Sequence, residues 1–120
     1  MMNRSGFLRQ LLGRPYALGA VGPESFDCFG LVAHVSEVLF GRRVPREGSA
    51  MLEARRRFAP AVIPVDGAIV VMRRGDRHVG IWLAAEGGIL HALEDKGVIF
   101  SPPATIPFFG FGQPRFFNPR

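Results

Sequence analysis

The single cysteine and the three histidines of this 120-residue chain are the side chains best suited to nucleophilic and acid–base chemistry near neutral pH. Cys28 follows Asp27, a good helix N-cap, so the thiol is expected where helix N–H groups and the helix dipole favour an anion. A free thiol has a pKa of about 8.5, and a helix N-terminus with a nearby imidazolium can lower this pKa and make the thiol a nucleophile. The base that this chemistry needs is predicted to be His78 or His91.

Each of these residues also has an ordinary structural interpretation. A lone cysteine in an apolar helix stripe is more often a packed hydrophobe, and strand histidines are more often partly buried polar residues. His34, at the edge of the same helix stripe, is expected to play no chemical part. A zinc site formed by Cys28, His78 and His91 lacks close ligand spacing and an evident fourth ligand, so we expect no metal and no cofactor.

The two strand histidines are expected to share one face of a sheet without touching. If the turn at AEGG pairs residues 83–84 with those near 89, His91 lies opposite the stretch 80–82. An even-numbered partner then places both imidazoles on one face. Simple pairing leaves them up to four residues apart, about 13 Å at about 3.4 Å per residue. Contact would need a bulge or a different register.

Helical patterns dominate the first half of the chain. Apolar spacing predicts a short helix within residues 1–15 that ends at Gly13, and a longer one over 28–40 that Gly41 stops. Residues 48–58 suit a further short helix closed by Pro60.

The second half changes to strand-like runs separated by turn sequences. The expected strands are residues 68–72, 78–83, 89–93 and 98–100, with a last one supplied by 108–117 that bulges at its glycines. Helices followed by a meander predict an α+β fold in a single domain over residues 1–120, with N-terminal helices packed on one face of an antiparallel sheet.

Composition excludes several classes of protein. With 48% hydrophobic and 11% aromatic residues, the chain is rich enough to bury a core and is not disordered. No apolar run approaches the roughly 20 residues that span a bilayer, and the N-terminus has no apolar segment typical of a signal peptide. The net charge of +5 comes mostly from arginine clusters without a nucleic-acid-binding motif, so we expect no nucleic-acid partner.

Four ordered motifs surround the candidate residues. They are GRPY with FDCFGLV (residues 13–16 and 26–32), DGAIVV (66–71), HVGIW (78–82) and ILHA (89–92). In this order and at these separations they resemble the NlpC/P60 cysteine peptidases of bacterial cell walls, over about residues 10 to 100.

The resemblance implies a papain-like fold and a role for each residue. Cys28 is implied to be the nucleophile, with its own backbone N–H as an oxyanion donor. His78 is implied to be the general base, oriented by His91. Tyr16 and Asp27 are predicted to contact the substrate, although Tyr16 has the alternative of merely packing its loop. The implied reaction is hydrolysis of a peptidoglycan stem-peptide amide, typically between γ-linked D-Glu and a diamino acid.

Two departures from the family pattern bear on the biological setting. Ala68 stands where an acidic residue is usual, and Phe29 replaces a small serine, which resembles versions from phage tails. With no export signal evident, we expect an enzyme made in the bacterial cytoplasm and carried on the tail of a phage or gene transfer agent particle. Its partners would be tail or baseplate proteins, docked by residues 108–117 unless these form an edge strand.

Two other functions stay open at this point. One is a structural tail-assembly module in which the papain-like fold serves only for docking. The other is an intracellular amidase or acyltransferase with the same fold.

Overall fold

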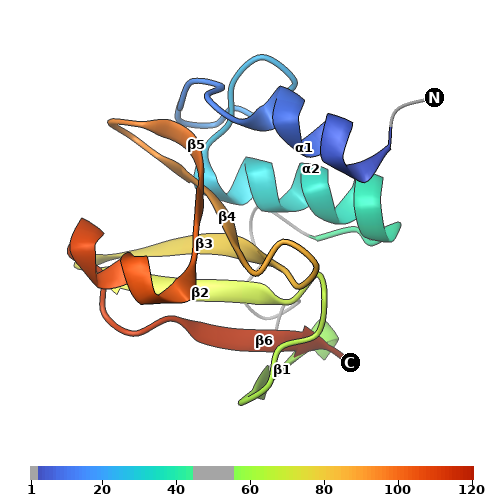
Figure 1. Cartoon of the computed structure of the whole chain (residues 1–120), viewed down its shortest axis with the longest axis vertical. Coiled ribbons are helices and arrows are strands. Elements are labelled where there is room, and N and C mark those ends of the chain that lie inside the picture. The colour runs from blue at the N-terminus through green and yellow to red at the C-terminus, as the bar shows by residue number, and fades with distance from the viewer. Residues whose placement is uncertain (1–2, 45–55) are drawn as a thin grey trace.

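A computed structural model describes residues 3–44 and 56–120 of the chain (Figure 1). Within these ranges the helices α1 and α2 lie together over one side of a six-stranded antiparallel sheet, which confirms the predicted α+β arrangement. The elements are α1 (Arg4–Leu11), α2 (Cys28–Phe40), β1 (Phe58–Ala61), β2 (Ile69–Arg74), β3 (Asp76–Leu83), β4 (Gly88–Leu93), β5 (Gly97–Ser101), the 3-10 helix η1 (Pro103–Phe109) and β6 (Arg115–Pro119).

Helix α2 begins and ends where the sequence predicts. The Asp27 side chain accepts a hydrogen bond from the Gly30 N–H at its start, and Gly41 ends it in a left-handed conformation. Helix α1 is shorter than expected, since it stops at Leu11 rather than Gly13. Among the described residues, no helix has both the length and the apolar character needed to cross a membrane.

The strand order is β1-β6-β2-β3-β4-β5, so the predicted meander forms one continuous block from β2 to β5. The last strand does not follow β5 in space but lies between β1 and β2. Of the helix expected over 48–58, residues 56–57 are helical, whereas Phe58 begins strand β1. Phe58 pairs with Pro119 and is 4% exposed, so pairing with β6 overrides the local helical pattern there. Residues 48–55 of that expected helix lie outside the described ranges.

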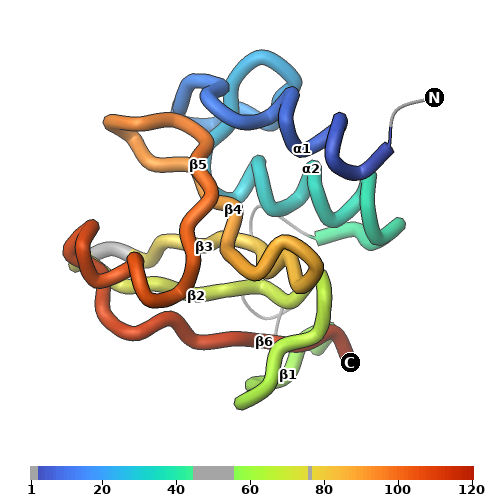
Figure 2. The backbone as a smooth tube through the Cα atoms, in the orientation of Figure 1, coloured from blue at the N-terminus to red at the C-terminus, as the bar shows by residue number. Residues whose placement is uncertain are grey.

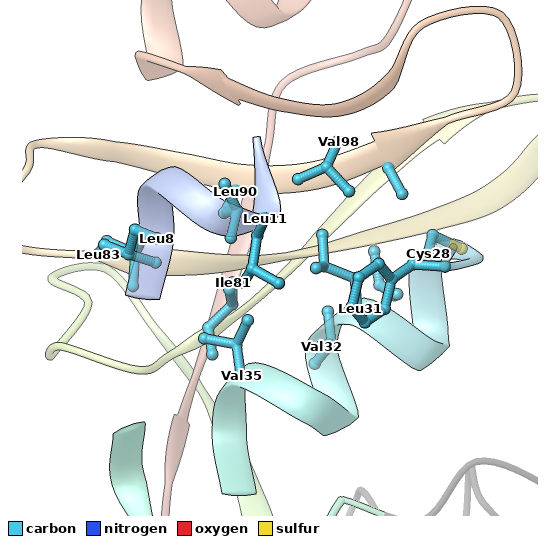
Figure 3. Packing of buried hydrophobic residues seen from close by; sticks show 13 residues of the cluster. Leu8, Leu11, Cys28, Leu31, Val32, Val35, Ile81, Leu83, Leu90 and Val98 are labelled. Atoms are coloured by element: carbon cyan, nitrogen blue, oxygen red, sulfur yellow. The ribbon is translucent and has the colours of Figure 1, made fainter. Parts of the chain in front are cut away.

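Two apolar clusters cover the two faces of the sheet. The first fills the space between the helices and the sheet, and Figure 3 shows Cys28 at one end of it. The second lies on the opposite face and includes Met72, Ile89, Ile106 and Phe111. Because side chains alternate along a strand, Val79 and Ile81 face the helices while His78 faces the second cluster.

The C-terminal segment completes this second layer. Figure 2 shows the chain leaving β5, turning through η1 beside the tip of the β2–β3 hairpin and returning as β6. The Gly112 N–H donates to the Arg73 carbonyl oxygen at 2.9 Å, which fastens the segment to that tip. The expected strand over 108–117 was wrong in its extent, because Phe108 and Phe109 belong to η1 and the glycines precede β6.

Strands β3 and β4 pack closely where Gly80 pairs with His91. A Cβ atom at Gly80 would lie 2.7 Å from Cγ2 of Ile89 and 3.1 Å from Cβ of His91. These separations are shorter than van der Waals contact, so any side chain at this position forces Ile89 and the facing part of β4 to move.

Replacing Gly80 by alanine is therefore expected to destabilise the protein by about 1–3 kcal/mol in urea unfolding. Gly112→Ala is the matched control, because its Cβ would meet nothing closer than the Arg73 carbonyl oxygen at 3.9 Å. Equal stabilities of the two variants would contradict the close approach at Gly80.

Candidate active site

The site lies where the sheet opens between β3 and β4. Their ladder ends at Gly80 and His91, whereas the β2–β3 ladder continues to Asp76 and the β4–β5 ladder to Leu93. The tips of the two hairpins therefore separate, and the β4–β5 tip lies beside the helices (Figure 1). An open pocket of about 260 Å³ occupies this end of the molecule, lined by Tyr16, Cys28, Arg74, Arg77, His78, Ala92, Leu93, Glu94 and Phe111.

This opening explains how Cys28 and His78 reach one pocket from opposite faces of the sheet. Cys28 belongs to the cluster on the helix side, whereas His78 points to the other side. Both line the pocket because no β4 residue pairs with β3 beyond Gly80. The backbone N–H of Val79, the residue after His78, forms a hydrogen bond that favours the Cys28 thiolate.

The two strand histidines are in direct contact. Nε2 of His78 lies 2.9 Å from Nδ1 of His91, and the rings meet edge to face. The expected shared face is confirmed, but the expected separation was wrong. His78 lies two residues from Gly80 on the strand facing His91, so the two rings are diagonal neighbours across a position that has no side chain.

A serine that the sequence analysis missed extends the pair. Nε2 of His91 lies 2.8 Å from Oγ of Ser101 on β5, and both residues are buried. His91 pairs with Ile99, so Ser101 is again a diagonal neighbour on the same face. The sequence feature that could have indicated this serine is its position two residues after Ile99, the partner of His91, which places it on the same face of the sheet as His91.

Aromatic side chains of the C-terminal segment cover the histidines. The Phe111 ring stacks on His78 with centroids 4.9 Å apart and planes 13° apart, and Phe109 meets His91 edge-on at 6.2 Å. The Arg74 guanidinium also lies over the Phe111 ring, with its central carbon 4.8 Å from the ring centroid. Water is thereby kept from one face of His78.

Burial makes both imidazoles weak bases. Desolvation lowers the pKa of His78 from 6.5 to about 3, with smaller contributions from His91 and Arg74. Desolvation also lowers the pKa of His91 to about 4. The pair is therefore neutral at pH 7.

The Cys28 thiol is shifted in the direction opposite to the sequence-based expectation. Burial raises its pKa, and the charge of Asp27 adds to the rise, while backbone hydrogen bonds from Val79, Phe29 and Cys28 itself oppose it. The helix-start N–H groups act as expected, but desolvation outweighs them. The resting site therefore holds a protonated thiol beside a neutral imidazole.

Tyr16 and Asp27 flank the thiol in different ways. Tyr16 lines the pocket and forms an isolated β-bridge with Phe26. Asp27 is 5% exposed, and its two carboxylate oxygens accept from the Gly30 N–H at 2.6 Å and the Gly19 N–H at 2.9 Å. Asp27 thus ties the loop before α2 to the start of the helix. The substrate contacts assigned to Tyr16 and Asp27 stay predictions.

Other chemistry-bearing residues lie apart from this pocket. The His34 ring packs near Phe7 and Phe26, with centroids 5.7 and 5.3 Å away. In the part of the chain that the structure describes, no three His, Cys, Asp or Glu side chains are grouped so that they could hold a metal ion.

A comparison with models of known protein families shows which family has this sequence pattern. Residues 13–108 match the model of the NlpC/P60 family. The chain belongs to the NlpC/P60 family. It is 35% identical over 88 residues to a probable endopeptidase of Corynebacterium glutamicum strain ATCC 13032, and equally so to one of strain R. These matches cover 73% of this chain but only 41% and 40% of the two relatives, so the chain spans about two fifths of their length.

Solved structures share the NlpC/P60 fold. The NlpC/p60 domain of the peptidoglycan hydrolase SagA aligns with a TM-score of 0.61 at 21% identity, over 97% of both chains. NlpC2 from Trichomonas vaginalis aligns with a TM-score of 0.70 at 18% identity, over 95% of this chain and 44% of the other. These likenesses confirm the predicted fold.

The buried neutral histidines predict a loss of stability in acid. In the unfolded chain His78 and His91 bind protons below about pH 6.5, whereas in the folded protein they do so only near 3 and 4. The unfolded state thus binds more protons in this window. The free energy of unfolding should fall as the pH drops from 6.5 toward 4, by up to about 1.4 kcal/mol per pH unit for each ring. Urea unfolding across this range measures it, and a His78→Gln variant that showed an undiminished slope would contradict the assignment.

The aromatic cover predicts a change in basicity when it is removed. Phe111→Ala admits water to the stacked face of His78, so the pKa of His78 should rise from about 3 toward 6.5. An NMR titration of the ring protons follows it. Phe108→Ala is the control from the same segment, since Phe108 is 86% exposed. Identical titrations of His78 in the two variants would show that Phe111 does not shield it.

Proposed function

We propose that this NlpC/P60 chain is a cysteine endopeptidase that hydrolyses stem-peptide amides of peptidoglycan. The observation that carries the proposal is the pocket shared by Cys28 and His78, in which His78 is held by His91. The names of its relatives support the reaction class, because two are probable endopeptidases and the SagA domain comes from a peptidoglycan hydrolase.

The protonated thiol and neutral imidazole define the first step. Nε2 of His78 faces His91, so Nδ1 is the ring nitrogen left to take the thiol proton. As the Cys28 sulfur attacks the carbonyl carbon, its proton passes to His78 and the carbonyl oxygen becomes an oxyanion. The Cys28 backbone N–H at the helix start is the proposed donor to that oxyanion.

The second half of the reaction regenerates the thiol. His78 returns the proton to the leaving amine, the C–N bond breaks and a thioester remains on Cys28. Water then attacks the thioester, giving one proton to His78, and the collapse releases a carboxylic acid and restores the thiol. The imidazolium exists only between these steps, which suits a ring whose burial disfavours the charged form.

The charges around the pocket fit a zwitterionic substrate. Arg74 and Arg77 lie on the β2–β3 hairpin, and Glu94 follows β4 on the opposite rim. Stem peptides carry free carboxylates beside the amino groups of their diamino acid. Guanidinium groups on one rim complement the carboxylates, and a carboxylate on the other complements an ammonium.

The setting that we propose is the tail of a phage or gene transfer agent particle. Its support is the bulky Phe29 directly after Cys28, which resembles tail-associated members of the family. Phe108 on η1 is 86% exposed and is the proposed contact with a tail or baseplate protein, whereas Phe109 and Phe111 pack inside. Sedimentation of the protein with phage-like particles tests this setting, and a protein found wholly free of particles would contradict it.

Digestion of purified peptidoglycan, followed by mass spectrometry of the fragments, tests the reaction. New stem-peptide fragments are expected from the unaltered protein and none from Cys28→Ala. His78→Ala should lower the rate about 100- to 10,000-fold, because it removes the general base. His34→Gln is the control histidine outside the pocket and should leave cleavage intact.

The reactivity of the thiol separates the alternatives if no cleavage occurs. A folded protein whose Cys28 reacts with an electrophile no faster than the Cys28 of His78→Ala would overturn catalysis and favour a docking module, because the protonated thiol needs His78 to take its proton. A fast-reacting thiol without cleavage would overturn the peptidoglycan assignment and favour an amidase or acyltransferase.

A further inference from the structure

Ser101 presents a buried hydroxyl at the far end of the histidine pair. It is 2% exposed, and its Oγ lies 2.8 Å from Nε2 of the fully buried His91. We propose that Ser101 is a positioning residue that fixes the tautomers of His91 and His78 by accepting a hydrogen bond from His91. Only the expected effect of Ser101 on the reaction rate rests on the proposed function, whereas its effect on the tautomers does not.

Two arrangements of protons fit the contact between the neutral rings. In the first, Nε2–H of His78 donates to Nδ1 of His91, and Nε2–H of His91 donates to the Ser101 hydroxyl oxygen. In the second, every donor and acceptor is reversed, and the Ser101 O–H donates to His91. Only the first leaves Nδ1 of His78 unprotonated and able to take a proton from a thiol.

The charged intermediate requires the first arrangement. An imidazolium at His78 carries protons on both nitrogens, so its Nε2 must donate to Nδ1 of His91. Neutral His91 then holds its proton on Nε2, which faces Ser101. The hydroxyl oxygen is the acceptor that this buried N–H needs, and without it the proton would be left unpaired.

The sheet holds these groups in fixed positions. His78, His91 and Ser101 are successive diagonal neighbours on β3, β4 and β5, all on one face. Phe109 closes this face edge-on against His91. Because rotation of the His91 ring would break contacts at both of its nitrogens, Ser101 controls the orientation of His78 through His91.

Nitrogen-15 NMR of the imidazole rings tests the proposal directly, since it distinguishes the two tautomers without any substrate. In the unaltered protein we expect both His78 and His91 to carry the proton on Nε2 and not on Nδ1. Ser101→Ala should give His91 a mixture of tautomers, and Ser101→Thr, which keeps the hydroxyl, should restore one. A His91 protonated on Nδ1 in the unaltered protein would overturn the proposal without recourse to any variant. An unchanged spectrum in Ser101→Ala would also overturn it.

Kinetics on peptidoglycan fragments supply the second readout. Ser101→Ala should lower kcat about 10- to 100-fold with KM unchanged, and Ser101→Thr should recover most of the loss. A fall confined to KM, or an equal fall in Ser101→Thr, would show a general packing role instead. An inactive unaltered protein would count against the proposed function alone, since the tautomers are decided by NMR.

Discussion

The end of the β3–β4 ladder at Gly80 and His91 is the constraint on which the site depends. Where β3 and β4 are paired, the sheet lies between the helix side and the histidine side. A thiol on the first side could not reach an imidazole on the second there. Beyond the end of the ladder the hairpins diverge, and Cys28 and His78 line the same pocket. The missing side chain at Gly80 lets the strands approach closely enough for His78 and His91 to touch diagonally. The opening and the contact between the histidines thus lie next to the same residue pair.

Burial then decides the protonation state of what meets there. The cover that holds the imidazoles in place also removes water from them, and this lowers the pKa of both rings. Burial at the helix-side cluster raises the pKa of the Cys28 thiol. An ion pair between thiolate and imidazolium would have to form in surroundings that penalise both charges. The neutral pair avoids that penalty, and charge develops only when a substrate carbonyl can receive it. A weak base in a dry site is therefore compatible with nucleophilic attack, provided that the tautomer is already correct.

The sequence predicted the parts of this arrangement that local pattern controls. Helix α2, its caps and the four strands of the meander follow from periodicity and turn chemistry within short windows. What failed depends on contacts between distant segments. Strand β1 pairs with the last strand, Phe111 stacks on a histidine 33 positions earlier, and Ser101 meets His91 across a register that no turn sequence fixes. The direction of the net pKa shift of Cys28 also could not be predicted from the sequence, because desolvation depends on the complete packing around a group.

The position of β6 gives the C-terminal segment its importance. Residues 102–114 connect β5 to β6. Because β6 pairs with both β1 and β2, it anchors the C-terminal end of this segment, and β5 anchors the other end. The intervening residues have little freedom to leave the histidine face, since Gly112 and Arg74 also bind them to the β2–β3 hairpin. The aromatic cover is thus held at three places by backbone and side-chain contacts. Loss of β6 pairing would expose His78 and His91 to water even with every catalytic side chain present, so the strand order and the chemistry of the site form one cooperative unit.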